Sequence, residues 1–102
     1  MSDWIDILAY RDFSDVPRMF LVVVDGRTLL FDCAFDDELD EYPADYTVYE
    51  LRNFRTDALP HDWTELPRRE AACKGRIPVR SVVFDATRRK QMKCTECREL
   101  LA

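Results

Sequence analysis

Histidine, glycine and long apolar runs are all scarce in this chain of 102 residues. The single histidine, His61, excludes any mechanism that needs two histidines. With two glycines and 47% hydrophobic residues, the composition is typical of a compact globular protein rather than a linker or a disordered tail. The longest apolar run, Met19–Val24, is too short to cross a bilayer, and no secretion signal is visible at the N-terminus. We therefore expect a cytoplasmic protein without a membrane partner, folded as a single domain over residues 1–102.

Basic residues are missing altogether between Thr28 and Leu51, a stretch that carries eight Asp and Glu residues. The asymmetry extends along the whole chain. Residues 1–67 hold sixteen acidic residues against five Arg, whereas residues 68–102 hold ten Lys and Arg against four acidic residues. The local balances of −11 and +6 give the overall net charge of −5. Such sorting of charge bears on the partners of a protein and not on its fold.

A β-hairpin is predicted over Pro17–Phe35, where two apolar runs flank Asp25-Gly26. An Asp-Gly pair allows positive φ at both central residues, which matches the twist of a two-residue hairpin turn. Both runs are apolar at nearly every position rather than at alternate ones. This pattern predicts a central hairpin with both faces covered, by a barrel interior on one side and a helix or partner on the other.

Three further strands are expected, at Trp4–Tyr10, Tyr46–Leu51 and Ile77–Phe84. In the second of these, Tyr46, Val48 and Glu50 share one face. Pro78 predicts that the third begins at a sheet edge or a bulge, because proline cannot donate to the ladder.

Two helical features are expected in the second half of the chain. Pro67 is a suitable start for a helical turn through Ala71 and Ala72 that ends at Gly75. Asp85 is a suitable N-cap for a C-terminal helix from Ala86 to about Leu101, in which Lys90, Cys94, Cys97 and Leu101 fall on one side.

These elements predict an α+β fold that is mainly antiparallel β. We expect a small curved sheet, or a partly open barrel of about five strands, with the C-terminal helix across one end. This architecture resembles the SH3-like class in strand count and size only; no SH3 motif is matched, so no binding residue carries over. The alternative is an α+β roll, in which residues 53–75 form a second full helix against the sheet.

Cys94-Thr95-Glu96-Cys97 is compatible with half of a zinc site or with a redox dithiol. A zinc site needs further ligands, from Cys33, Cys73 or His61, and a redox pair belongs at a helix N-terminus rather than late in a helix. We expect both cysteines to be packing residues and the protein to hold no cofactor, with metal binding by Cys94 and Cys97 as the weaker alternative. All four cysteines are expected to be reduced thiols.

The acidic run of residues 36–41 lacks the ligand spacing of a calcium loop and is expected to be a solvated loop after the hairpin. Acidic surfaces of this kind bind basic partners, and some mimic the phosphates of nucleic acid. We expect the partner-binding residues to be Asp36, Asp37, Glu38, Asp40, Glu41, Tyr42, Asp45 and Tyr46.

Basic residues gather at Arg88-Arg89-Lys90, with Lys93 and Arg98 nearby. With a pI near 4.8, the chain does not have the strongly basic character of a nucleic-acid-binding domain, so we expect no nucleic-acid partner. Docking of this basic segment against the acidic loop, within one chain or between two subunits of a homodimer, is the use we expect for it.

No catalytic residue is assigned. His61 next to Asp62 is expected to be a surface or capping residue, and the aromatic set of Trp4, Trp63, Tyr42, Tyr46 and Tyr49 to be core and rim packing. The sequence therefore favours a non-enzymatic protein-interaction module that uses its acidic loop. The alternatives are a thiol or zinc protein and an acidic inhibitor or immunity-type protein.

Overall fold

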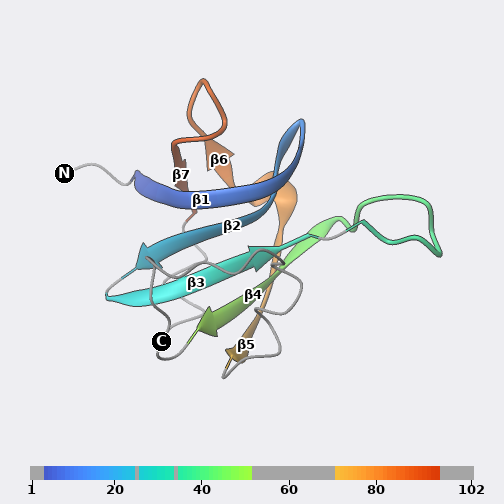
Figure 1. Ribbon diagram of the computed structural model, residues 1–102, viewed down its shortest axis with the longest axis horizontal. Coiled ribbons are helices and arrows are strands. Elements are labelled where there is room, and N and C mark those ends of the chain that lie inside the picture. The colour runs from blue at the N-terminus through green and yellow to red at the C-terminus, as the bar shows by residue number, and fades with distance from the viewer. Residues whose placement is uncertain (1–3, 25, 34, 52–70, 95–102) are drawn as a thin grey trace.

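The computed structural model describes residues 4–24, 26–33, 35–51 and 71–94. In these residues the chain forms one antiparallel sheet of seven strands, which curls into a half-barrel (Figure 1). The strand order across the sheet is β5-β4-β3-β2-β1-β7-β6. The strands are β1 (Ile5–Ser14), β2 (Val16–Val24), β3 (Arg27–Asp32), β4 (Asp45–Leu51), β5 (Ala71–Pro78), β6 (Val83–Phe84) and β7 (Gln91–Lys93).

The predicted central hairpin is confirmed as β2 and β3. Their ladder runs from Met19 opposite Asp32 to Val24 opposite Arg27, which leaves a two-residue connection. Gly26 has φ +77°, and a Cβ added there would meet no atom within 4 Å. Glycine is therefore required at this position by the backbone conformation and not by crowding.

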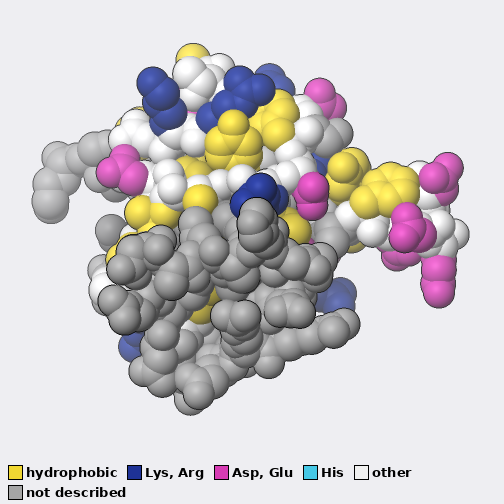
Figure 2. Space-filling view, viewed as in Figure 1, with side chains coloured by type: hydrophobic (Ala, Val, Ile, Leu, Met, Phe, Trp, Pro, Cys, Tyr) yellow, Lys and Arg dark blue, Asp and Glu magenta, His cyan; other side chains and the backbone are white. Residues whose placement is uncertain are grey.

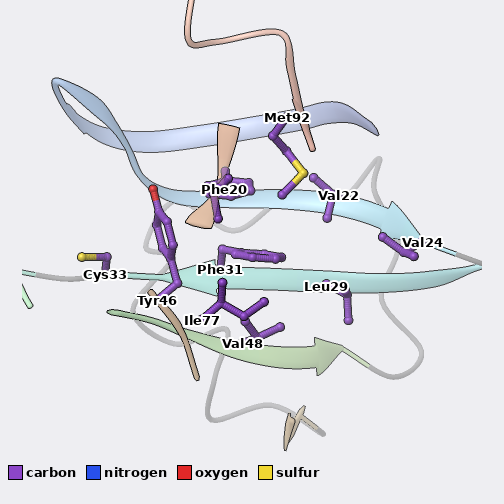
Figure 3. Packing of buried hydrophobic residues seen from close by; sticks show 11 residues of the cluster. Phe20, Val22, Val24, Leu29, Phe31, Cys33, Tyr46, Val48, Ile77 and Met92 are labelled. Carbon is purple, nitrogen blue, oxygen red and sulfur yellow. The ribbon is translucent and has the colours of Figure 1, made fainter. Parts of the chain in front are cut away.

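Both faces of the hairpin are buried, as its continuous apolar pattern predicts. The larger of two clusters of buried apolar side chains lies on the concave face of the sheet (Figure 3). In it, Phe20 stacks on Phe31 with ring centroids 4.7 Å apart. Met19, Leu21, Leu30 and Leu51 form a second buried cluster. Successive side chains along a strand point to opposite faces of the sheet. Because both faces of this hairpin are apolar, each has to be shielded from water.

The predicted first strand is confirmed, but it runs on through the polar residues to Ser14. A bulge between Ile7 and Ala9 shifts the register with β2, and Asp15 turns the chain with φ 64° between paired Ser14 and Val16. Aspartate tolerates this left-handed conformation better than most residues, which allows the tight turn.

The predicted strand Tyr46–Leu51 is confirmed as β4, but the prediction of a strand over Ile77–Phe84 is wrong. β5 ends at Pro78, and a 3-10 turn at Val79–Ser81 separates it from β6. Pro78 lies at the end of an edge strand, consistent with its missing N–H group.

The helical turn predicted through Ala71 and Ala72 is also wrong, because both residues belong to β5. Gly75 has φ 140° and lies opposite Val48, next to the register shift in the pairing of β4 with β5. Its role is to form a bulge rather than to end a helix. The rest of the proposed second helix lies outside the described residues.

The C-terminal helix is not formed in residues 86–94, and no α-helix occurs in the described ranges. Asp85 instead closes the loop between β6 and β7 by accepting hydrogen bonds from the backbone N–H groups of Thr87, Lys90 and Gln91. Met92 of β7 then enters the core opposite Ile5 of β1. An aspartate that caps a helix satisfies the same kind of donors as one that caps a loop, which explains the error. The fold described is therefore antiparallel β, with seven strands rather than about five.

Candidate functional site

The acidic loop, residues 36–45, follows β3, ends at the first residue of β4 and projects away from the sheet (Figure 1). A backbone bridge closes its tip: the N–H of Asp36 donates to the carbonyl of Glu41 at 2.9 Å, and the N–H of Glu41 donates back at 3.3 Å. Asp40 takes a left-handed φ of 54° in the turn between them. The tip is thus a small closed turn that stands out from the body of the protein.

Asp36 braces this tip from within. Its Oδ1 atom accepts hydrogen bonds from the N–H groups of Glu38 at 3.0 Å and Leu39 at 3.2 Å. This arrangement is an Asx-type turn, which local aspartate side chains commonly form. Asp36 is therefore part of the framework of the loop, which leaves its neighbours to face solvent.

The base of the loop is fixed to the sheet by a chain of side-chain contacts. The Arg18 guanidinium lies over the Tyr42 ring at 4.3 Å, and Phe35 meets that ring edge-on with centroids 5.1 Å apart. The buried Cys33 thiol donates to the carbonyl of Pro43 at 3.3 Å. These contacts hold both ends of the loop in place before any partner arrives.

Four exposed carboxylates flank one exposed leucine in the sequence of the tip. Asp37, Glu38, Asp40 and Glu41 are exposed and form no ion pair within the described part of the chain. Leu39 stands in the middle of their sequence with 65% of its surface exposed, the highest value among the large hydrophobic residues described. Figure 2 shows these acidic side chains gathered on the projecting part of the molecule.

The remaining expected partner-binding residues do not share this exposure. Tyr42 is half-buried at the loop base, and Asp45 is half-buried at the start of β4. Tyr46 has no exposed surface; its ring meets Phe20 and Phe31 edge-on, and its hydroxyl donates to the carbonyl of Pro17 at 2.7 Å. Burial also raises the pKa of Tyr46. The structure therefore brings the residues from Asp36 to Tyr42 together and places Tyr46 in the core.

The cysteines lie at separate places in the fold. Cys33 is in the core, where burial raises the pKa of its thiol; Cys73 is exposed on β5, and Cys94 is half-buried against the larger cluster. Cys97 and His61 lie outside the described residues, and so do the zinc and redox hypotheses that depend on them. Among the residues described, no three His, Cys, Asp or Glu side chains are grouped as metal ligands.

Sequence reasoning identified only half of a second surface, which we call the basic edge: Tyr10 and Phe13 of β1, with Arg88, Arg89 and Lys90 of the β6–β7 loop. Arg89 lies over the Phe13 ring at 4.4 Å, and Arg88 donates to the carbonyl of Asp15 at 2.9 Å. The basic run itself was visible in the sequence. Its aromatic neighbours are more than seventy positions away along the chain, and only the pairing of β7 with β1 brings them close.

No family model, curated protein or solved structure matches this chain. Within the described residues, no helix has the length and apolar character needed to cross a membrane.

Proposed function

We propose that this protein is a non-enzymatic interaction module whose acidic loop recognises a basic protein surface. The observation that carries the proposal is a projecting loop, braced at tip and base. It presents Leu39 next to carboxylates that form no ion pair with the residues the structure describes. An apolar side chain that fills a pocket on a partner supplies binding energy, and charges around it direct approach and register. Because the loop is held in shape before binding, little conformational entropy is lost on association.

The partner surface could be the basic active site of an enzyme. The projection of the loop beyond the sheet would allow its tip to enter a cleft, which favours an inhibitor or immunity-type role as the second candidate (Figure 1). Both candidates require the same loop residues and differ only in whether the partner loses activity when bound.

The experiment is capture of partners from lysate by the immobilised protein, with and without neutralised loop carboxylates. The test variant is Asp37→Asn with Glu38→Gln, because neither carboxylate braces the loop. The matched control is Asp6→Asn with Asp12→Asn, which removes the same charge from exposed positions on β1. Asparagine also tolerates the φ of 55° at Asp12.

We expect the loop variant to lose captured partners that the wild type and the control retain. Capture by the wild type should also weaken as salt rises, because the screening length falls from about 30 Å at 0.01 M to about 8 Å at 0.15 M. Leu39→Ser should weaken capture at both salt concentrations, because its contribution is apolar. Equal capture by loop variant and wild type would rule out the proposal.

A further inference from the structure

The basic edge is a stretch of sheet edge that the rest of the described chain leaves partly uncovered. β1 pairs with β7 only at Ile5 and Asp6, and Ile7 donates one more hydrogen bond to Lys90 at 2.8 Å. Beyond that point, no described strand pairs with the outer side of β1. Tyr10 and Phe13 there are 37% and 38% exposed, with their rings edge-to-face at 6.1 Å. An unpartnered edge with exposed aromatic side chains is a natural place for another chain to bind.

The loop between β6 and β7 lines this edge with fixed positive charge. Asp85, the one carboxylate in the loop, accepts hydrogen bonds from the Thr87 hydroxyl and from three backbone N–H groups. Its oxygens are therefore engaged within the loop. Arg88, Arg89 and Lys90 are exposed and form no ion pair in the described residues. The edge thus presents Arg89 over the Phe13 ring, with Arg88 and Lys90 next to it in the loop and one exposed carboxylate, that of Asp12, between the two aromatic residues in the sequence.

The acidic loop is complementary to this edge in both charge and apolar content. One surface has an exposed leucine with two carboxylates on each side of it in the sequence, and the other has Arg89 over the exposed Phe13 ring, with Tyr10 against Phe13. The two surfaces make no ion pair with each other within the chain. Figure 2 shows the acidic loop at the right of the molecule and basic side chains along its top. Both surfaces are therefore open to contact with a second molecule.

We propose that the basic edge is a docking site for the acidic loop of a second copy of this chain. Leu39 of one copy would pack against Tyr10 and Phe13 of the other, with the loop carboxylates facing the cations of the β6–β7 loop. The inference rests on the proposed function, because it names the partner of the same acidic loop. Each copy carries both halves of the contact, so association produces a chain or ring of molecules, or a dimer in which the contact is made twice.

The test is sedimentation of the purified full chain over a range of concentrations, at low and moderate salt. Wild type should self-associate, and the association should weaken as salt rises. Asp37→Lys with Glu38→Lys, and separately Arg88→Glu with Arg89→Glu, should each weaken self-association by about tenfold or more. The control variant Asp6→Asn with Asp12→Asn also loses two negative charges. It should associate at least as well as wild type, because asparagine keeps the Oδ1 acceptor for Gln91 and the loss of the Asp12 charge makes the edge more positive.

A mixture of the two charge-reversed variants gives the decisive result. One variant retains a normal basic edge and the other a normal acidic loop, so together they should form a complex although each alone does not. If a reversal at the edge disturbs folding, as judged by circular dichroism, Arg88→Gln with Arg89→Gln replaces it in the same mixture. A wild type that stays monomeric, variants that associate normally, or a mixture without a complex would each overturn the inference.

The outcomes separate this inference from the proposed function. Purified protein that stays monomeric, while the loop variant still loses captured partners, leaves the proposed function intact and overturns self-docking. If the loop variants keep both partner capture and self-association, the proposed function and self-docking are both overturned. Binding of a single-stranded oligonucleotide by monomeric wild type, lost in the Arg88 and Arg89 variant, would assign the edge to a polyanion and also overturn self-docking.

Discussion

Tyr46 shows how one residue can satisfy a surface pattern in the sequence and still belong to the core. It follows directly after Asp45, at the end of the acidic segment, which suggested a place in the recognition surface. The alternation of β4, however, puts it on the same face as Val48, and this face is the concave, buried one. Strand periodicity predicted its neighbours correctly, whereas proximity along the chain to the acidic loop predicted an exposure that it does not have.

Tyr46→Phe should therefore destabilise the protein without changing the acidic loop. The variant keeps the ring between Phe20 and Phe31 but leaves the buried carbonyl of Pro17 without its 2.7 Å donor. An unsatisfied buried acceptor costs about 1–3 kcal/mol, measurable by urea unfolding. The same substitution at Tyr49, on the opposite face of β4, should cost less than about 0.5 kcal/mol. Equal losses at the two positions would contradict this role for the hydroxyl.

At the scale of elements, β1 to β4 were predictable from local patterns, whereas β5 and β7 fall largely where helical segments were expected, although β5 is eight residues long. The local sequence specifies the hairpin of β2 and β3 through two apolar runs and an Asp-Gly turn. In β4, side chains suited to the two faces of a sheet alternate along the strand. β6 and β7 have two and three residues, and they form because β1 offers an edge and the core accepts Met92. Nothing local distinguishes their connecting loop from the first turn of a helix, since Asp85 would cap either one.

Asp85 should make the stability of the β6–β7 hairpin depend on pH. The hydrogen bond from the Thr87 hydroxyl, with those from three backbone N–H groups, holds the pKa of the Asp85 carboxyl well below its usual 3.8. Because folding lowers the pKa of this carboxyl, its ionised form stabilises the folded protein at any pH above the pKa of the unfolded chain. This stabilisation is lost progressively as the pH falls below about 4. Asp85→Asn should thus lower the thermal midpoint at neutral pH, and the difference from wild type should shrink below about pH 4.

The control for this pH profile is Asp37→Asn, because the Asp37 carboxylate accepts no hydrogen bond within the described residues. Its thermal midpoint should follow that of wild type across the same range. A constant difference between Asp85→Asn and wild type from pH 7 to 3 would indicate that the loop depends on the shape of the side chain and not on its charge.

For the whole molecule, the sorting of charge along the sequence becomes two surfaces at different places on one curled sheet. The sequence correctly predicted a loop after the hairpin for the acidic run. It did not predict the base of the loop, since the contact of Arg18 with Tyr42 joins β2 to a distant part of the chain. It did not predict the closed tip either, because the backbone hydrogen bonds between Asp36 and Glu41 have no distinct motif in the sequence. The basic edge was harder to predict, because its aromatic residues and its cations are distant in sequence and only the pairing of β1 with β7 brings them together.

Because the acidic loop projects beyond the core, its removal should separate recognition from stability. Replacing residues 36–41 with Asn-Gly keeps the contact between Phe35 and Tyr42 and provides a two-residue hairpin turn. The free energy of unfolding, followed by circular dichroism in urea, should change by less than about 0.5 kcal/mol, because the replaced residues contribute nothing to either buried cluster. Partner capture and self-association should both be lost. A large loss of stability would mean that the tip supports the fold, and retained capture would place recognition elsewhere on the molecule.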